Sequence, residues 1–403
     1  MTRITLVEGG EPVEVVLDAR TGAALAGSGV VAAEPSPLVP DIWRLRPTTY
    51  IGVAEVAGVE LWITPKVEIA RLLFLIGYAL NPRGWRGEEV ALRRETELLP
   101  AMAVAFERQA DRALQQGLLQ GYRRTEESLS VLRGRIREAD QLRYRFGLAV
   151  PLEVVYDDFT VDIPENRLLL SAALRLLRLP RIPEMVRHRL LRAVTRMVDV
   201  DEIPKGHQLP SWQPTRLNTR YHTAVRLAEL VLKAGSVEQA TGEVQVSGFL
   251  FDMARIFEDF VTVALSEAVR GSIRPVTQDT GWTLDVERRA KIRPDLMLYG
   301  EGGSVVGVVD AKYKAERPSG FPDADLYQML AYCTALGLRQ GRLIYAKGNE
   351  EPARYTVRNA GTEILAHALD LQASPDDILD QLSGIAQEVT NRSVEVRSAA
   401  GSG

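Results

Sequence analysis

The sequence has very few cysteines and histidines, and this scarcity excludes several kinds of site. Cys333 is the one cysteine among 403 residues, so the chain can form no disulfide framework and no cysteine-rich zinc or iron–sulfur centre. A single thiol suits a reducing interior. The four histidines show no metal-ligand spacing; they are His188, His207, His222 and His367.

No lysine follows a glycine, and this absence excludes an ordinary P-loop, whose lysine comes directly after a phosphate-cradling glycine. The residues before the seven lysines are Pro65, Pro204, Leu232, Ala290, Ala311, Tyr313 and Ala346. The sequence also lacks the G-x-S-x-G turn of an α/β-hydrolase. We therefore expect the chain alone to bind no nucleotide, and we expect a partner protein to supply any nucleotide hydrolysis.

Long apolar runs are absent as well. Leu72–Leu80 is a run of nine residues, whereas a helix that spans a bilayer needs about 20. The N-terminal sequence MTRITLVEGGEPVEV carries acids where a signal peptide has a basic and then an apolar segment. With 53 acidic and 49 basic residues, the chain is no general polycation. These features predict a cytoplasmic protein that does not enter a membrane.

Residues 1–82 contain short runs of β-branched and aromatic residues, which predict a β-rich region. The runs are Val13–Leu17, Tyr50–Val56 and Val59–Ile63. Because only Ala57 and Gly58 separate the last two runs, we expect a β-hairpin there.

Residues 83–240 follow a helical pattern, with apolar residues at three- and four-residue spacing. Asp162 is placed to cap one of these helices, with Pro164 in its first turn. The segment 167–196 holds eight arginines and one acid, Glu184. A solvated helix face, internal ion pairs or a surface that binds DNA phosphates would each explain this excess. The candidate DNA contacts are Arg175, Arg178, Arg187 and Arg192.

Residues 241–403 predict a mixed α/β domain. The strongest helical pattern covers Gly248–Arg270, and further helices are expected over Asp325–Leu336 and Pro375–Val389. The strand-like runs are Trp282–Val286, Lys291–Leu298, Val305–Ala311, Leu343–Ala346, Arg354–Val357 and Ile364–Leu369. The chain is therefore predicted to be an α+β multidomain protein with a β-rich N-terminal region, a helical middle and a C-terminal mixed-sheet domain.

Two of these predicted strands contain residues that indicate a catalytic site. The run RPDLML is followed by a glycine-rich turn and then by VVGVVDAK. The second run is apolar up to Asp310, which predicts a central strand buried on both faces. Asp310 and Lys312 lie two residues apart and so project from the same face, where they could meet Asp295 from the first run.

Three charged groups at the end of a buried strand are costly unless a ligand compensates them. Asp295, Asp310 and the backbone carbonyl of Ala311 would offer the oxygen ligands that Mg²⁺ prefers, and Mn²⁺ could substitute for it. Lys312 would orient a metal-activated water and neutralise charge on a phosphate. The simpler alternative is a hairpin with a surface Asp–Lys pair, worth ~0–1 kcal/mol. The apolar run that leads into Asp310 argues against it.

The spacing Pro-Asp…Asp-x-Lys resembles the PD-(D/E)xK nuclease motif, and this resemblance implies two further site residues. Glu258, in the preceding helix, stands where such nucleases often carry a supporting acid, although its neighbour Asp259 competes for that role. Gln328 with Tyr332 resembles the Gln-x-x-x-Tyr helix of RecB-like members, although an ordinary helix-surface pair has the same spacing.

The chain contains, in this order, RPTTYIGVAEVAGVELWITPKVE, FTVDIPENRLLLSAALRLL, FDMARIFEDFV and RPDLML…VVDAKYK. This combination, from about Arg46 to Lys347, resembles the McrC family, the nuclease subunit of McrBC-type restriction systems. The resemblance implies a prokaryotic, Mg²⁺-dependent endonuclease subunit that cuts double-stranded DNA at modified sites. It also implies that residues 1–82, with Lys66 near their end, dock on a McrB-like AAA+ GTPase ring and stimulate it, and that residues 241–403 form the endonuclease domain.

Two other functions stay open. A stand-alone RecB-like repair nuclease would cut DNA with Mg²⁺ and without a nucleotide. A non-catalytic adaptor would only activate a partner NTPase, but such a protein has no need to bury Asp295, Asp310 and Lys312.

Overall fold

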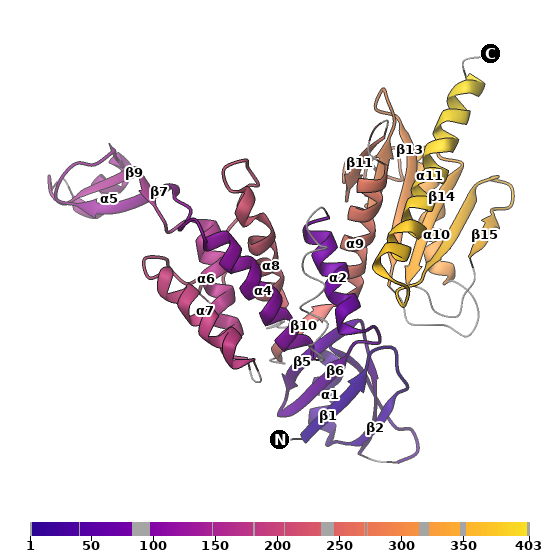
Figure 1. Ribbon diagram of the computed structural model, residues 1–403, viewed down its shortest axis with the longest axis horizontal. Helices are drawn as coiled ribbons and strands as arrows, with labels where there is room; N and C mark the ends of the chain where they lie inside the picture. The colour runs from indigo at the N-terminus through magenta and orange to yellow at the C-terminus, as the bar shows by residue number, and fades with distance from the viewer. Residues whose placement is uncertain are drawn as a thin grey trace. The chain divides into compact units, whose positions relative to one another are not determined.

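The computed structural model describes residues 2–39, 41–82, 97–146, 148–179, 182–204, 206–234, 246–269, 271, 273–313, 322–346 and 352–400 (Figure 1). By its internal contacts the chain forms two compact units, one of residues 1–101 with 237–403 and the other of residues 102–236. The predicted boundaries at 82/83 and 240/241 involve segments outside the described residues, so the three-part division stays a prediction. Within the described residues, none of the helices has the length and hydropathy that a bilayer span requires.

The first unit contains a four-stranded sheet built from both ends of its sequence. Its strands, in sheet order, are β1 (Thr2–Val7), β6 (Val59–Thr64), β5 (Tyr50–Val56) and β10 (Val246–Asp252). The turn between β5 and β6 places Ala57 and Gly58 at positive φ, so the predicted hairpin is confirmed. Helix α2 (Ile69–Leu80) follows the hairpin and packs against helix α9 (Met253–Ala268).

A smaller sheet in the same unit consists of β2 (Val13–Val16), β4 (Ile42–Pro47) and β3 (Val31–Pro35). Helix α1 (Ala19–Gly27) is capped by Asp18, whose carboxylate accepts a hydrogen bond of 2.9 Å from the Thr21 amide. Gly22 is required in this helix because a Cβ there would lie 2.0 Å from the ring of Trp43. The sequence pattern had predicted only the first of these four elements.

Helix α9 begins later than predicted. The prediction started it at Gly248, but residues up to Asp252 pair with β5 and belong to strand β10. Asp252 then caps the helix by accepting a hydrogen bond of 3.0 Å from the Ala254 amide. Strand β10 therefore leads directly into α9. The first residues of the apolar pattern are extended because they pair with the edge of β5.

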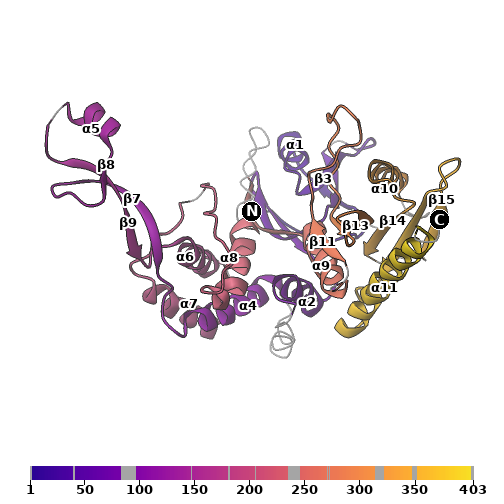
Figure 2. The same cartoon turned by 90° about the horizontal axis from the view of Figure 1, so that it is seen from above.

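A six-stranded sheet forms the rest of this unit. In sheet order its strands are β11 (Arg274–Thr277), β12 (Leu296–Tyr299), β13 (Val305–Lys312), β14 (Gln340–Ala346), β16 (Glu363–Leu369) and β15 (Ala353–Thr356). Helix α10 (Asp323–Leu336) covers one face, and α9 with α11 (Pro375–Ala400) covers the other (Figure 2). The predicted central position of β13 is confirmed, since β12 pairs with it antiparallel and β14 parallel.

The strands expected over Trp282–Val286 and Lys291–Leu298 are mostly absent. Thr283 and Lys291 form one isolated bridge, and β12 begins only at Leu296. The reason is a local turn, in which the Asp285 carboxylate accepts hydrogen bonds from the amides of Arg289 and Ala290.

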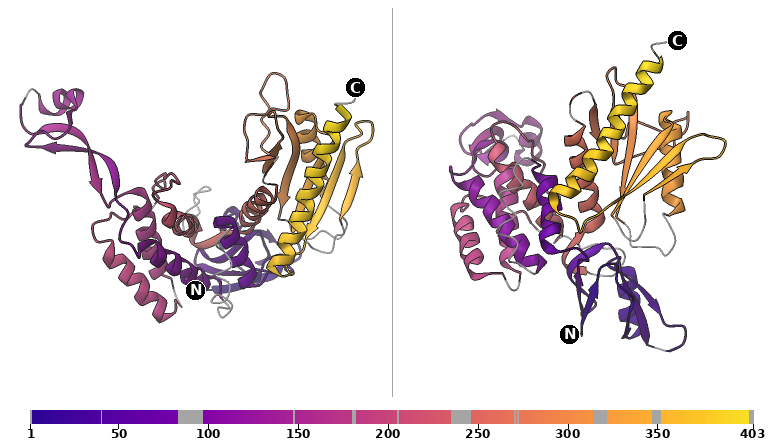
Figure 3. Two further views of the ribbon diagram at one scale, coloured as in Figure 1. Left: turned by 45° about the horizontal axis from the view of Figure 1, so that its top comes forward. Right: turned by 45° about the vertical axis from the view of Figure 1, so that its right-hand side comes forward.

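The second unit combines helices with a strand arm. Its helices are α4 (Leu98–Leu114, which begins in the first unit), α6 (Pro164–Leu177), α7 (Glu184–Arg196), the short η2 (Thr219–Tyr221) and α8 (His222–Ala234). The arm consists of β7 (Gly121–Leu129), β8 (Arg135–Ile136), α5 (Glu138–Arg145) and β9 (Leu152–Thr160). Figure 3 shows β7 and β9 as a long ribbon that extends away from α6 and α7 and carries α5 at its tip.

The prediction of a helical middle region is wrong over the strands β7, β8 and β9. Strand β9 has the β-branched and aromatic residues of a strand, but β7 (GYRRTEESL) has mostly residues that suit a helix surface. β7 is extended because it pairs with β9 over nine residues. That pairing joins segments about thirty residues apart, so a local periodicity does not reveal it.

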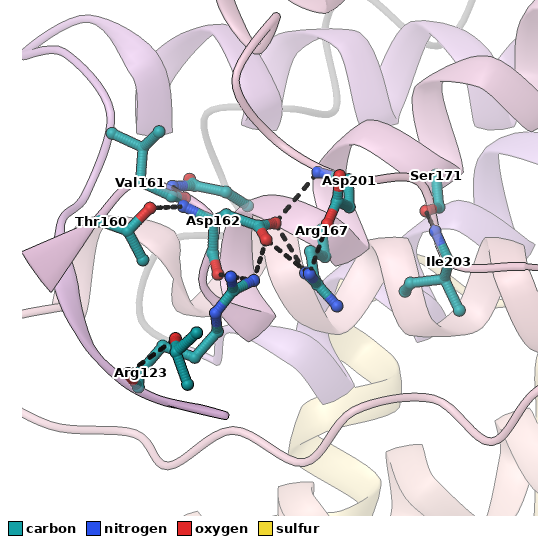
Figure 4. A network of polar contacts seen from close by, with 10 residues as sticks. Arg123, Thr160, Val161, Asp162, Arg167, Ser171, Asp201 and Ile203 are labelled. Atoms are coloured by element: carbon teal, nitrogen blue, oxygen red, sulfur yellow. Dashed lines mark hydrogen bonds and ion pairs between the residues drawn. The ribbon is translucent and has the colours of Figure 1, made fainter. Parts of the chain in front are cut away.

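A buried carboxylate ties the arm to the helices of the second unit (Figure 4). Asp162 was predicted as the cap of α6, but the cap is Ile163, and the Asp162 side chain instead forms ion pairs with Arg123 of β7 and Arg167 of α6. It also accepts a hydrogen bond of 3.0 Å from the Asp201 amide. Burial raises the pKa of Asp162, but the hydrogen bonds and charges of these partners outweigh burial and lower that pKa to about 2.

Candidate active site at the end of strand β13

Strand β13 carries a carboxylate into the interior of the six-stranded sheet. The residues before Asp310 are valines and a glycine that pack within the sheet, and Asp310 itself is 2% exposed. Its side chain forms an ion pair with the ammonium of Lys312, two residues further along the same face. The ammonium contacts Oδ2 of Asp310, which is otherwise buried.

Asp295 reaches the same place from the neighbouring strand. Leu296 pairs with Val309, so Asp295 lies beside the strand end that carries Asp310. The backbone N–H of Ala311 donates a hydrogen bond of 2.8 Å to Oδ2 of Asp295. The pKa of Asp295 is raised to about 7. Burial is the main cause, the charge of Asp310 adds to the rise, and the hydrogen bond from the Ala311 N–H opposes it. The predicted convergence of the two aspartates is therefore present.

Lys312 completes the group. Burial lowers the pKa of its ammonium, but the nearby carboxylates, with Asp310 first and Asp295 next, outweigh burial and raise that pKa above its usual range. Lys312 therefore stays a cation, held between acidic side chains at the end of the strand.

Glu258 lies on α9 near these charges. Burial raises the pKa of Glu258, the charge of Lys312 lowers it, and the charge of Asp310 raises it again. These effects place the Glu258 carboxyl within electrostatic reach of the β13 residues. Its competitor Asp259 is exposed to solvent, which leaves Glu258 as the acid of α9 that faces the site.

Gln328 and Tyr332 interact one helical turn apart on α10, as their spacing predicts. The Gln328 amide donates a hydrogen bond of 2.9 Å to the Tyr332 hydroxyl. Burial raises the pKa of Tyr332, and the charges of Asp310 and Asp295 raise it further. Tyr332 thus lies close to the two aspartates, whereas Gln328 is exposed and is connected to them through Tyr332.

Two buried side chains of this region were missed by the sequence reasoning. Asp325 of α10 accepts a hydrogen bond of 3.0 Å from the hydroxyl of Tyr345, and its charge helps to raise the pKa of Lys312. Tyr345 lies opposite Lys312 in the parallel register of β13 and β14. A signal existed for Asp325, because it shares a helix face with Gln328 and Tyr332. No sequence signal existed for Tyr345, which depends on the strand register.

The donor set suits a hard divalent cation. Two carboxylates lie side by side, and burial together with the negative charge of Asp310 raises the pKa of Asp295, so the two charges repel each other. A cation bound between them would relieve that repulsion with the oxygen ligands that Mg²⁺ prefers. In the part of the chain that the structure describes, no cluster of three or more His, Cys, Asp or Glu side chains is close enough to hold a metal. Water and the predicted Ala311 carbonyl would have to complete the coordination.

The arginines of segment 167–196 mostly have partners within the second unit. Arg178 forms an ion pair of 3.3 Å with Glu202, and Arg187 donates a hydrogen bond of 2.8 Å to the Leu177 carbonyl. Arg175 is half-buried, and Arg181 lies outside the described residues. Arg192 is exposed and lines a cavity of about 320 Å³; the other lining residues are Glu107, Asp111, Arg189, Leu190, Ala193 and Arg196. Contact between these arginines and DNA stays a prediction.

Comparison with known proteins gives one family and one shared fold. A family model described as McrBC 5-methylcytosine restriction system component matches residues 45–346. A solved structure described as the refined half-complex from a tetradecameric assembly of Thermococcus gammatolerans McrB AAA+ hexamers with bound McrC is 18% identical, with a TM-score of 0.55. That match covers 96% of this chain and 100% of the other.

A second solved structure, described as the cryo-EM structure of the Thermococcus gammatolerans McrBC complex, is 19% identical with a TM-score of 0.38. The match covers 67% of this chain and 89% of the other. None of the curated proteins matches this chain.

Proposed function

This chain belongs to the family of McrBC 5-methylcytosine restriction system components, and from that premise we propose that it is the endonuclease subunit of a McrBC-like restriction system. The observation that carries the proposal is the convergence of Asp295, Asp310 and Lys312 at the end of β13. We assign these residues to a PD-(D/E)xK active site in residues 241–403.

The roles of the residues follow from their positions. Mg²⁺, or Mn²⁺ in its place, would supply an activated water and offset charge on the phosphate when bound. Asp295 and Asp310 would hold the cation, together with the backbone carbonyl of Ala311. Lys312, kept cationic by the surrounding carboxylates, would orient the attacking water and stabilise the negative charge of the transition state.

Supporting roles fall to Glu258 and Gln328. The Glu258 carboxyl lies within electrostatic reach of Asp310 and Lys312, so it would bind a metal-bound water or a second cation. Gln328 is exposed beside Tyr332, where its amide could contact the DNA backbone. The exposed Arg192 is the best placed of the predicted arginines to bind phosphate, because Arg178 and Arg187 already have partners.

We propose that an AAA+ GTPase ring of the McrB kind is the partner. The similar solved structure is described as McrB AAA+ hexamers with bound McrC. Residues 1–82, with Lys66, remain the predicted docking region. The arm offers a second docking surface, because its tip exposes large apolar side chains; these are Val131, Leu142, Phe146 and Leu148. Phe146 alone is 91% exposed, which favours contact with another protein at this tip.

The nuclease assignment can be tested with isosteric variants. We expect Asp310→Asn and Lys312→Met to lower DNA cleavage by at least about a hundredfold, because each removes a charge that acts on the phosphate or metal. Both variants should still stimulate the GTPase of the partner. The exposed Asp323→Asn of α10 is the control and should cut like the wild type.

The outcome separates three functions. Cleavage of DNA without the partner or a nucleotide would favour a stand-alone repair nuclease. Normal cleavage by the Asp310→Asn variant would contradict the assigned site. GTPase stimulation by a wild type that never cuts would favour a pure adaptor.

A further inference from the structure

Tyr313, directly after Lys312, is buried in a junction with the N-terminal sheet. Its side chain is 5% exposed, and its ring centroid lies 5.7 Å from that of Phe257 on α9. The ammonium of Lys66 lies over the ring, 5.3 Å from its centroid. Lys66 follows the β5–β6 hairpin, so the junction joins segments almost 250 residues apart in sequence.

A buried acid, Glu8, also belongs to this junction. Glu8 is 4% exposed, and its carboxylate accepts a hydrogen bond of 3.3 Å from the backbone N–H of Lys66. The carboxyl group faces the hydroxyl of Tyr313, although no hydrogen bond of regular geometry joins them. Glu8, Lys66 and Tyr313 thus form one polar cluster, with Phe257 packed against the Tyr313 ring, and we refer to it as the Tyr313 junction.

The backbone near Lys312 has support from only one neighbouring strand. The pairing of β12 with β13 ends at Leu296 and Val309. Beyond Val309, β13 pairs only with β14, up to Lys312 opposite Tyr345. Next to this unpaired edge, the Ala311 amide donates a hydrogen bond to Asp295, and the Tyr313 side chain that follows packs against Phe257 and Lys66.

We propose that Tyr313, anchored by Glu8 and Lys66, is a positioning residue for Lys312, so that the N-terminal sheet is part of the cleavage apparatus. This proposal rests on the nuclease function proposed above. Tyr313 directly follows Lys312 in the chain, so a fixed Tyr313 limits how far the backbone of Lys312, and with it the Lys312 ammonium, can move. Displacement of a catalytic group by about 1 Å can cost about a hundredfold in rate.

The first test compares two tyrosine truncations in the full chain assembled with its partner ring. We expect Tyr313→Ala to lower kcat for DNA cleavage by at least about tenfold, with KM for DNA and GTPase stimulation unchanged. Tyr313→Phe, which keeps the ring between Phe257 and Lys66, should stay within about threefold of the wild type.

The control is Tyr299→Ala. Tyr299 is 7% exposed and lies at the end of β12 away from Asp295, so its loss should lower thermal stability comparably and leave kcat unchanged. A kcat for folded Tyr313→Ala within about twofold of the wild type would overturn the proposal.

A second variant keeps the test decisive if Tyr313→Ala does not fold. Lys66 is only half-buried, so Lys66→Met removes the ammonium over the ring and should leave the fold intact. We expect a drop in kcat of about three- to tenfold, and no additional drop when Lys66→Met is combined with Tyr313→Phe. Loss of GTPase stimulation in Lys66→Met with an unchanged kcat would show that Lys66 serves docking instead, and would refute the positioning role. A wild type that does not cleave at all would instead refute the nuclease function itself.

Discussion

At the level of single residues, the buried aspartates Asp310 and Asp162 have charged neighbours of opposite kinds. Asp310 lies beside a second carboxylate, Asp295, whose pKa is raised by burial and further by repulsion from the charge of Asp310. Asp162 lies between two arginines, and its own pKa falls to about 2. An acid that repels its neighbour suits cation binding, whereas an acid satisfied by arginines suits structural support. The surroundings of each residue, and not its type, decide which role it has.

The Asp162 network should make the second unit sensitive to acid. The pKa of Asp162 is lower in the folded chain than its ordinary value of 3.8, so the ion pairs contribute their full stability above pH 4 and lose it as the pH falls toward 2. We expect Asp162→Asn to lower the free energy of unfolding by roughly 2 kcal/mol at pH 7, and the difference from the wild type to shrink between pH 4 and pH 2.

Urea unfolding of the full chain at pH 7, 4 and 3 measures this difference. The exposed Asp199→Asn serves as the control and should stay within about 0.5 kcal/mol of the wild type. An Asp162→Asn variant whose deficit stays constant from pH 7 to pH 3 would contradict the ion-pair explanation.

At the level of elements, close backbone packing determines where strands meet. Strand β10 lies against β5 so tightly that a Cβ on Gly248 would be 2.4 Å from the Val53 carbonyl oxygen and 2.6 Å from the Ala54 Cα. This contact fixes the start of α9 at the edge of the N-terminal sheet. The glycine is therefore a packing requirement of the sheet and not a flexible point.

Gly248→Ala should destabilise the protein by more than about 2 kcal/mol, because the neighbouring atoms are backbone and cannot move aside cheaply. The matched control is Gly384→Ala in α11, where nothing lies within 4 Å of the added Cβ. That helical substitution should stabilise by up to about 1 kcal/mol. Differential scanning calorimetry of both variants compares them, and equal melting temperatures would argue against the close β5–β10 contact.

At the level of the whole molecule, cutting and docking are predicted to depend on different groups. The aspartates and Lys312 belong to the first unit, whereas the exposed apolar side chains of the arm belong to the second. A protein that acts with a ring partner needs both, and each can be removed without the other. Docking through the arm should therefore be separable from cutting, whereas the predicted docking region of residues 1–82 lies in the same unit as the aspartates.

Phe146→Ser combined with Leu148→Ser should lower stimulation of the partner GTPase, because it removes exposed apolar area that a partner would bury. Both side chains are exposed, so thermal stability should be unchanged. Met185→Ser, an exposed apolar residue of α7, is the control. Full stimulation by the double variant would contradict docking through the arm and leave residues 1–82 as the predicted docking region.

The sequence alone determined the features that depend on local periodicity. The two-residue period of a strand placed Asp310 and Lys312 on one face, and the apolar run before them predicted a central strand. Turn residues predicted the β5–β6 hairpin, and helical spacing predicted the Gln328–Tyr332 pair. Each of these depends on neighbours within a few residues, so a pattern in the sequence is enough to show it.

Tertiary structure decided what depends on pairings between distant segments. β7 is extended only because β9 lies beside it, Tyr345 meets Lys312 only through the register of two parallel strands, and Glu8 reaches Tyr313 only after the chain has returned through β10. The partners of the arginines were decided in the same way. Such pairings are set by burial and register over the whole fold, and no local period in the sequence encodes them.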